Sequence, residues 1–204
     1  MSHLVQSETG VLIRRQVLLA QSLDRLDECH LSLARAAELL ISTLREGGRV
    51  LIAGNGGSAA QAEHFSAELV GRFLCDRAPF AAMALTADTS ILTAVANDFG
   101  YCQVFARQLE GLGRPGDAFV GISTSGNSAN VVLAAEAAQR MGIAVISLTG
   151  EGPNQLSERA TVAIHAPASE TPTIQELHLV MVHHLAEMVE QQLTGHDATG
   201  ATLQ

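Results

Sequence analysis

The sequence predicts an α/β protein in which a parallel sheet is covered by helices on both faces. Two observations carry this prediction. Short runs that are apolar throughout alternate with longer segments whose apolar residues recur at helical spacing. Strands without a polar face need cover on both sides, and a helix between consecutive strands supplies it while keeping the strands parallel. At 204 residues the chain is long enough to bury one sizeable core, so we expect one main domain.

A helical segment precedes the first strand. Apolar residues recur at helical spacing over residues 11–45, which predicts one long helix or two. Gly47 and Gly48 end the pattern, as glycines commonly do after a helix C-terminus. We expect the apolar stripe to pack in the core or between subunits. Residues 1–10 and 194–204 are expected to be loose tails.

Strands and helices then alternate to the end of the chain. The expected strands are 49–54, 79–85, 116–123, 143–150 and 160–167. The expected helices are 58–73, 88–98, 103–112, 130–142 and 173–193. No linker or repeat interrupts this order. We therefore divide the chain into an N-terminal helical segment, 1–48, which packs on the domain and on other subunits, the main domain, 49–193, and a tail, 194–204.

The composition excludes several classes of function. A net charge of −9, with no run of basic residues, argues against nucleic acid or an anionic membrane as partner. All twelve basic residues are arginine, so neither a Walker-type phosphate lysine nor a Schiff-base lysine is present. Apolar residues make up 47% of the chain and charged residues 16%, which favours burial of surface between subunits.

The sequence also predicts a cytoplasmic location. Its N-terminus has no basic segment followed by an apolar run, as a secretory signal would, and no apolar run approaches the roughly 20 residues of a membrane span. Cys29, Cys75 and Cys102 are widely spaced and odd in number, which is typical of reduced packing cysteines.

Two strand-to-helix loops carry the residues that suit a ligand. In a parallel α/β sheet, ligands bind beyond the carboxyl ends of the strands. The loop "STSGNS", 123–128, follows the third strand and precedes a helix N-terminus. Its hydroxyl groups, exposed N–H groups and helix dipole suit a phosphate dianion. Helix capping alone is the simpler alternative, but four hydroxyl groups in six residues favour phosphate binding; they belong to Ser123, Thr124, Ser125 and Ser128.

The loop "GNGGS", 54–58, admits three interpretations. Gly54, Gly56 and Ala59 fit the dinucleotide fingerprint, but that fingerprint needs an acidic residue about 20 positions further on. The next candidate, Asp88, is about 30 residues away. A triphosphate site would need the missing lysine. A small phosphorylated ligand held by both loops is therefore favoured, with a nicotinamide-dependent oxidoreductase as a minor alternative.

Histidine and carboxylate side chains predict a metal site. His64 and Glu68 are four residues apart, so they share one face of the helix after "GNGGS". The last helix carries a second polar group on an otherwise apolar segment: Gln175, Glu176, His178, His183 and His184. Imidazole, carboxylate and amide groups that meet there would hold a metal ion.

In combination these motifs resemble the sugar isomerase (SIS) family, in particular its phosphoheptose isomerase branch. The resemblance covers residues 48–190 and rests on "AGNGGSA", "AEHFSAEL", "LTAVANDFGY", "GISTSGNSANV" and "IQELHLVMVHH" in this order. It implies a three-layer αβα sandwich with a five-stranded, flavodoxin-like parallel sheet. It also implies a zinc-dependent aldose–ketose isomerase, with one zinc ion per subunit. The reaction would convert sedoheptulose 7-phosphate to D-glycero-D-manno-heptose 7-phosphate for bacterial lipopolysaccharide or surface glycan.

The resemblance also implies roles for individual residues. Asn55, Gly56, Gly57, Ser58, Glu68 and Gln175 would line the substrate, and Asn97 and Asp98 would contact sugar hydroxyls. Ser123, Thr124, Ser125 and Ser128 would hold the phosphate. The implied metal ligands are His64, Glu68, Gln175 and His183, with Glu68 and His183 as the acid/base pair. Without the resemblance, Asn97 and Asp98 indicate only a polar turn. The family forms tetramers with sites built across subunits.

Gln175 poses a geometric difficulty among the implied metal ligands. It is eight residues from His183, about 12 Å along a straight helix. Both can bind one ion only if the helix begins irregularly or different subunits contribute. His64, Glu68 and His183 are accordingly the firmer of the implied ligands.

Two segments of the sequence depart from the family pattern. Relatives often carry paired glycines where this chain has "GEGPNQ", 150–155, and many have Asp where it has Glu170. These departures concern the substrate more than the metal ligands.

The alternative function is that of a non-catalytic SIS-fold protein that associates with the replication initiator DnaA. Such proteins tend to lose the glutamate and histidine matched by Glu68 and His183, so an enzyme is favoured.

Overall fold

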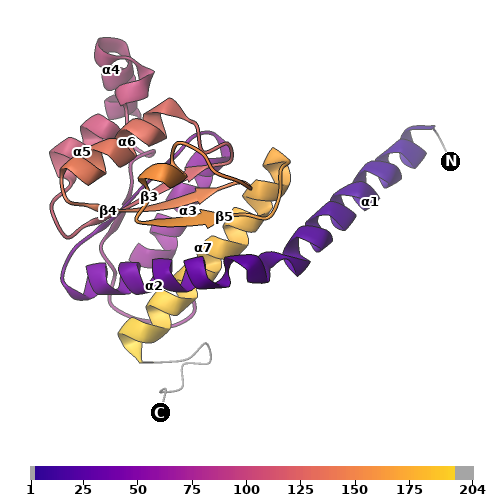
Figure 1. The fold of residues 1–204 in the computed structure, drawn as a ribbon, viewed down its shortest axis with the longest axis horizontal. Coiled ribbons are helices and arrows are strands. Elements are labelled where there is room, and N and C mark those ends of the chain that lie inside the picture. The colour runs from indigo at the N-terminus through magenta and orange to yellow at the C-terminus, as the bar shows by residue number, and fades with distance from the viewer. Residues whose placement is uncertain (1–2, 196–204) are drawn as a thin grey trace.

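All five predicted strands are present and run parallel. The computed structural model describes residues 3–195, and within that range the strand order is β2-β1-β3-β4-β5, the flavodoxin-like order (Figure 1). The strands are β1 (Val50–Gly54), β2 (Ala82–Ala84), β3 (Ala118–Ser123), β4 (Ala144–Thr149) and β5 (Val162–His165). The α/β prediction is thereby confirmed.

Helices connect these strands and precede them. They are α1 (His3–Asp24), α2 (His30–Arg45), α3 (Gly57–Val70), α4 (Thr89–Phe99), α5 (Ala106–Leu112), α6 (Ala129–Arg140) and α7 (Thr171–Thr194). Three short 3₁₀ helices lie between them: η1 (Leu26–Cys29), η2 (Tyr101–Gln103) and η3 (Ser157–Arg159). In the described part of the chain, no helix has both the length and the apolar character needed to cross a membrane.

The sheet separates two apolar cores, which makes the predicted three layers. Successive side chains of a strand point to opposite faces. Val50 and Ile52 therefore join a core with α2, α3 and α7, whereas Leu51 and Ala53 join a second core with α5 and α6. All four residues are at most 1% exposed. β1 thus lies in the middle of the fold, with its carboxyl end at the loop 54–58.

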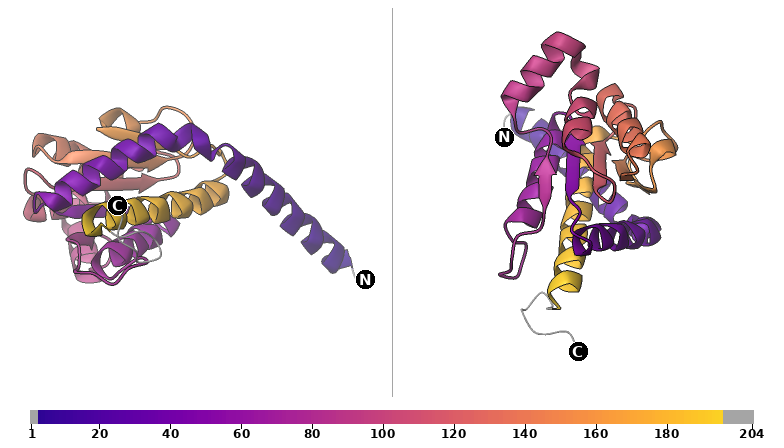
Figure 2. Two further views of the ribbon diagram at one scale, coloured as in Figure 1. Left: turned by 90° about the horizontal axis from the view of Figure 1, so that it is seen from below. Right: turned by 90° about the vertical axis from the view of Figure 1, so that its left-hand side faces the viewer.

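The N-terminal helix begins earlier than predicted. Residues 3–10, expected as part of a loose tail, belong to α1. No proline lies in residues 1–24, so the helix can extend to His3 without a break. The helical pattern over 11–45 divides into two helices separated by η1, which is one of the two predicted arrangements. α1 projects from the body of the molecule (Figures 1 and 2). At the other end, α7 reaches Thr194, and the remainder of the expected tail, 196–204, lies outside the described residues.

Other boundaries shift for local reasons. The expected strand 79–85 shrinks to β2, because Pro79 lacks a donor and the Phe80 N–H bonds to the Leu69 carbonyl instead. The expected helix 58–73 ends at Val70, where the Gly71 N–H closes the last turn on the Ala67 carbonyl.

α4 lies at the edge of the second core, where Leu92, Val95 and Ala96 pack against it. It has no fully buried residue, contacts η2, and protrudes from the top of the molecule in Figure 1. Asn97 and Asp98, the last residues of the expected helix 88–98, lie in the last turn of α4, before Gly100 with a φ of +88°.

Candidate active site and metal centre

The two ligand-type loops lie side by side at the carboxyl edge of the sheet. β1 pairs with β3, and their last residues are in register, Gly54 with Ile122. From β1 the chain passes to β2 on one side of β1 in the sheet, whereas from β3 it passes to β4 on the opposite side. This point, where the strand order reverses, is where open α/β sheets bind ligands. The topology therefore brings the loops 54–58 and 123–128 to one place.

Close backbone approaches explain the glycines of the first loop. A Cβ on Gly54 would lie 2.6 Å from the carbonyl oxygen of Ser58, and Gly56 has a φ of +55°. A Cβ on Gly57 would overlap the side-chain amide of Gln175. The glycines thus allow a tight strand-to-helix turn and the approach of α7 to the start of α3.

The second loop gathers hydroxyl groups at the N-terminus of α6. The Ser123 and Ser128 hydroxyl oxygens are 3.0 Å apart, and Ser128 is the N-cap residue. The Gly126 N–H bonds to the Ser123 carbonyl with a φ of +63°, which a side chain rarely adopts. Ser125 is exposed and Thr124 half-buried. This arrangement of hydroxyls at a helix N-terminus suits an anion.

His64, Glu68 and His183 come together between α3 and α7. The two histidine Nε2 atoms are 2.8 Å apart, and Glu68 Oε1 lies 3.4 Å from His64 Nε2. One ligand atom from each of the three residues lies within 4.8 Å of the others. Phe73 packs on the His183 ring, with centroids 5.5 Å apart. The three side chains therefore form a half-buried group that could hold a metal ion.

The donor set fits a zinc-type ion after a small movement. At 2.8 Å the two imidazoles share a hydrogen bond, so one ring carries its proton on Nε2. Two such nitrogens on a tetrahedral zinc ion lie about 3.3 Å apart, and both must be unprotonated. Separation of the rings by about half an ångström and loss of that proton would complete the site.

Gln175 lies elsewhere in the same chain. α7 is regular from Thr171, and the Gln175 side chain packs on Gly57 while its carbonyl accepts a hydrogen bond from Gln61 Nε2 at 2.5 Å. Gly57 precedes His64 by seven residues, about 10 Å along α3. Within one chain, Gln175 thus belongs to the loop 54–58 and not to the histidine pair.

The other polar residues that the sequence singled out do not join the group of His64, Glu68 and His183. Asn97 and Asp98 lie exposed on α4, where the Asn97 amide donates to Asp98 Oδ1 at 2.8 Å. His184 is exposed, and Glu176 is half-buried. His178 is fully buried, and its Nε2 lies 3.1 Å from the Thr149 carbonyl oxygen. His178 is therefore a core residue.

The buried position of His178 predicts a pH-dependent stability. Burial lowers its pKa from 6.5 to about 4, opposed in part by the Thr149 carbonyl. The unfolded chain binds a proton near pH 6.5 and the folded chain only near pH 4, so stability is full above pH 6.5 and falls toward pH 4. We expect a loss of about 3 kcal/mol over this interval. Denaturant titrations at pH 7 and pH 4.5 measure it, with His178→Leu expected to flatten the dependence and exposed His184→Gln to leave it unchanged. An equal pH slope in wild type and His178→Leu would contradict this assignment.

Sequence reasoning missed residues that support the loops. Asn130 exchanges two hydrogen bonds of 2.8 Å with Asn55, and the Tyr101 hydroxyl donates to Asn55 at 3.0 Å. Asn154 packs against Gly126, where a Cβ would overlap its side chain. Asn130 lies inside the motif "GISTSGNSANV", but only the fold shows that it faces Asn55.

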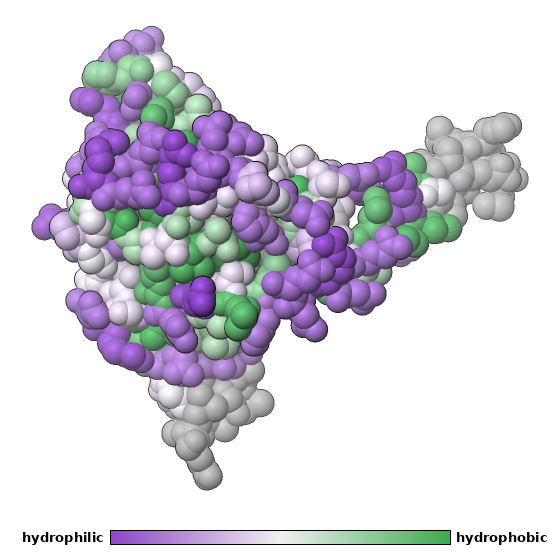
Figure 3. All heavy atoms as spheres, viewed as in Figure 1, coloured by the Kyte–Doolittle hydropathy of each residue, from purple (hydrophilic) through white to green (hydrophobic). Residues whose placement is uncertain are grey.

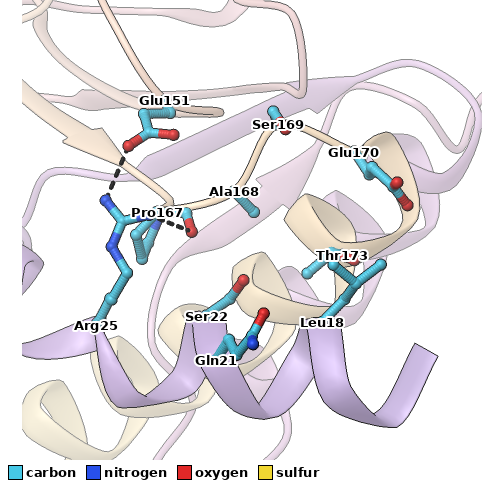
Figure 4. Close-up of a pocket in the computed structure, with 10 residues that line it drawn as sticks. All are labelled: Leu18, Gln21, Ser22, Arg25, Glu151, Pro167, Ala168, Ser169, Glu170 and Thr173. Carbon is cyan, nitrogen blue, oxygen red and sulfur yellow. Dashed lines mark hydrogen bonds and ion pairs between the residues drawn. The ribbon is translucent and has the colours of Figure 1, made fainter. Parts of the chain in front are cut away.

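A pocket between α1 and the loop that precedes α7 lies apart from these residues (Figure 4). Its volume is about 370 Å³. Arg25 spans it, donating to Glu151 at 2.8 Å and to the Pro167 carbonyl at 3.5 Å. None of its ten lining residues belongs to the predicted site, so we do not place the substrate there.

The chain is similar to known proteins over most of its length. The SIS domain profile matches residues 18–150. A phosphoheptose isomerase from Akkermansia muciniphila is 48% identical over 90% of this chain and 97% of its own length. One from Mycobacterium bovis is 51% identical over 82% of this chain and 86% of its own length.

Solved structures agree with this similarity. The phosphoheptose isomerase of Neisseria gonorrhoeae is 39% identical with a TM-score of 0.81, covering 92% of this chain and 99% of that one. The enzyme of Francisella tularensis is 33% identical with a TM-score of 0.85, covering 91% and 98%. The chain belongs to the phosphoheptose isomerase family of SIS-domain proteins.

Proposed function

We propose that this protein is an aldose–ketose isomerase that converts sedoheptulose 7-phosphate to D-glycero-D-manno-heptose 7-phosphate. One observation carries the proposal: His64, Glu68 and His183 converge within 4.8 Å. The neighbouring loop 123–128 suits the phosphate, and relatives at 48–51% identity are named phosphoheptose isomerases. Zinc, one ion per chain, is the proposed metal, since imidazole and carboxylate are its usual ligands.

The chain's own residues would divide the work of the reaction. Ser123, Thr124, Ser125 and Ser128 bind the phosphate, and Asn55, Gly56, Gly57, Ser58 and Gln175 line the sugar. Glu68 removes the proton from the carbon beside the carbonyl, and a proton returns at the neighbouring carbon, so the reaction is redox-neutral through a cis-enediol. His183 would be the acid/base partner of Glu68 and serve the neighbouring carbon or oxygen. A divalent ion at this site supplies Lewis-acid polarisation of the carbonyl.

The substrate-contact roles of Asn97 and Asp98, and a metal-ligand role of Gln175, require a second subunit. Asn97 and Asp98 lie on the protruding α4, and Gln175 is about two helical turns from His64 along α3. We propose that a site built between subunits brings them to the substrate and the ion.

A homo-oligomer, in particular a tetramer, is accordingly part of the proposal. Exposed apolar residues on α1 and α4 support it (Figure 3); they are Val11, Leu12, Ile13, Val17, Leu23, Ile91 and Phe99. Such patches commonly mark interfaces. Light scattering that gives the mass of a single chain would contradict it. A cytoplasmic location and a role in lipopolysaccharide or surface glycan synthesis complete the proposal.

Incubation with sedoheptulose 7-phosphate tests the function directly. We expect NMR to show a new aldose heptose phosphate signal that grows with enzyme concentration. The retained Glu68 and His183 favour an enzyme over a DnaA-associating protein. Capture of DnaA with no detectable isomerisation would contradict the proposal, as would stabilisation by NADH with no isomerisation.

A further inference from the structure

We propose that Tyr101 is a further substrate-binding residue, whose hydroxyl oxygen accepts a hydrogen bond from a hydroxyl group of the sugar. The inference rests on the proposed function and names a residue to which no contact with the substrate was assigned above. Tyr101 is the chain's one tyrosine and begins η2, directly after the protruding α4. Its side chain is 61% exposed, so its free side can be reached by a ligand.

The position of Tyr101 follows from a pair of asparagines that joins the two loops. Asn55 directly follows β1, and Asn130 lies in the first turn of α6, two residues after Ser128. Their side-chain amides exchange two hydrogen bonds of 2.8 Å. The pair therefore spans the junction of β1 and β3, between the phosphate loop and the loop that leads to His64. The Tyr101 hydroxyl lies 3.0 Å from Asn55 Oδ1, so it is at this junction.

The direction of every hydrogen bond in this group is fixed. The Val131 N–H can only donate, and it meets Asn130 Oδ1 at 3.0 Å. The Asn130 nitrogen consequently faces Asn55 Oδ1, and the Asn55 nitrogen faces Asn130 Oδ1. Asn55 Oδ1 is an acceptor, so the Tyr101 hydroxyl must give its proton to it. The backbone of α6 thus determines the polarity of the tyrosine hydroxyl.

This polarity leaves one acceptor and one donor for a ligand. With its proton committed, the Tyr101 oxygen can only accept, and among the described residues no group donates to it. The Asn55 nitrogen uses one of its two hydrogens on Asn130 and keeps the other. A sugar hydroxyl both donates and accepts, so it matches this edge. A phosphate dianion has no proton to give and does not match it.

The variant Tyr101→Phe tests the inference, because it removes one oxygen from an exposed ring. We expect the KM for sedoheptulose 7-phosphate to rise about 3- to 10-fold, the effect of one neutral hydrogen bond, with kcat nearly unchanged. Inhibition by inorganic phosphate should keep its wild-type constant, since phosphate offers no sugar hydroxyl. Thr93→Val is the matched control, because it also removes one hydroxyl group from this segment. In the described part of the chain the Thr93 hydroxyl bonds to the α4 backbone alone, so KM should be unchanged.

The outcomes separate the inference from the proposed function. If the wild type isomerises the heptose phosphate and Tyr101→Phe has the same KM, the inference is wrong and the function stands. If phosphate inhibition weakens as much as KM rises, Tyr101 acts by arranging the loops, which also overturns direct sugar contact. If the wild type neither binds nor isomerises the substrate, the proposed function fails and this role fails with it.

Discussion

Replacing Glu68 with glutamine is expected to lower kcat/KM by about 10²- to 10⁴-fold, the usual contribution of a general base. Glutamine keeps the shape and a ligand oxygen but cannot take a proton at neutral pH. The fold should be unaffected, because the Glu68 side chain is only partly buried. Arg77 Nη2 donates to the backbone carbonyl oxygen of Glu68 at 2.8 Å and not to its carboxylate, so the substitution leaves this hydrogen bond in place. Steady-state kinetics and thermal unfolding of the two proteins give both quantities.

A control variant and a metal analysis show whether the loss of activity comes from the missing base. Glu63→Gln neutralises a carboxylate on the same helix, one residue before His64, and should retain wild-type activity, because glutamine can still accept the Thr86 hydrogen bond. Metal analysis of Glu68→Gln separates the loss of a base from the loss of an ion. A Glu68→Gln protein with wild-type turnover would exclude Glu68 as the base.

Replacing Glu190 with glutamine is expected to destabilise the protein by about 3–5 kcal/mol. Its carboxylate accepts hydrogen bonds from the backbone N–H groups of Phe73, Leu74 and Cys75, at 2.7–3.0 Å, and from Arg77 Nε at 2.9 Å. The Glu190 and Arg77 side chains are 3% and 5% exposed. Glutamine would leave the Arg77 charge buried without its partner.

The pKa of Glu190 gives this prediction a pH signature. Burial acts to raise the pKa, but the N–H groups of Cys75, Phe73 and Leu74, together with Arg77, lower it below its ordinary value of 4.5. Its stabilising contribution is therefore present above pH 4.5 and is lost as the pH falls through the lower folded value.

Denaturant unfolding at equal chain concentration measures the effect. Glu187→Gln, on the same helix, is the control. Within residues 3–195 the Glu187 side chain bonds to Gln191 alone, one turn further along the helix, so its loss should change stability by less than about 0.5 kcal/mol. A Glu190→Gln protein as stable as the control would contradict the structural role. The ion pair of Arg77 and Glu190 joins the loop after α3 to α7. Its loss should therefore also loosen the contact between His64 on α3 and His183 on α7.

Local chemistry determined how much of the fold could be predicted. β1 and β3 are apolar throughout and lie at the centre of the sheet, so both were located to within one or two residues. β2 is a half-exposed edge strand, and its start depends on the partner of the Phe80 N–H group, which bonds to Leu69 and not to β1. The early start of α1 has no clear signal in the sequence, because residues 6–10, QSETG, are polar or glycine and carry no apolar stripe.

The candidate site could be predicted only in part, for a similar reason. The four-residue spacing of His64 and Glu68 places both on one helical face, which requires no tertiary information. Their meeting with His183 depends on how α3 packs against α7, and the same packing moves Gln175 to Gly57. The contact of Tyr101 with Asn55 joins residues 46 positions apart and has no local signal.

Titration of the metal-free protein with zinc tests the central claim most directly. The protein is stripped with a chelator, dialysed, and assayed on sedoheptulose 7-phosphate as zinc is added. If His64, Glu68 and His183 hold the required ion, activity should be absent at first, rise linearly, and reach a plateau near one zinc ion per chain. His183→Ala should neither retain zinc nor gain activity. Full activity in the stripped protein, with no response to added zinc, would contradict the claim.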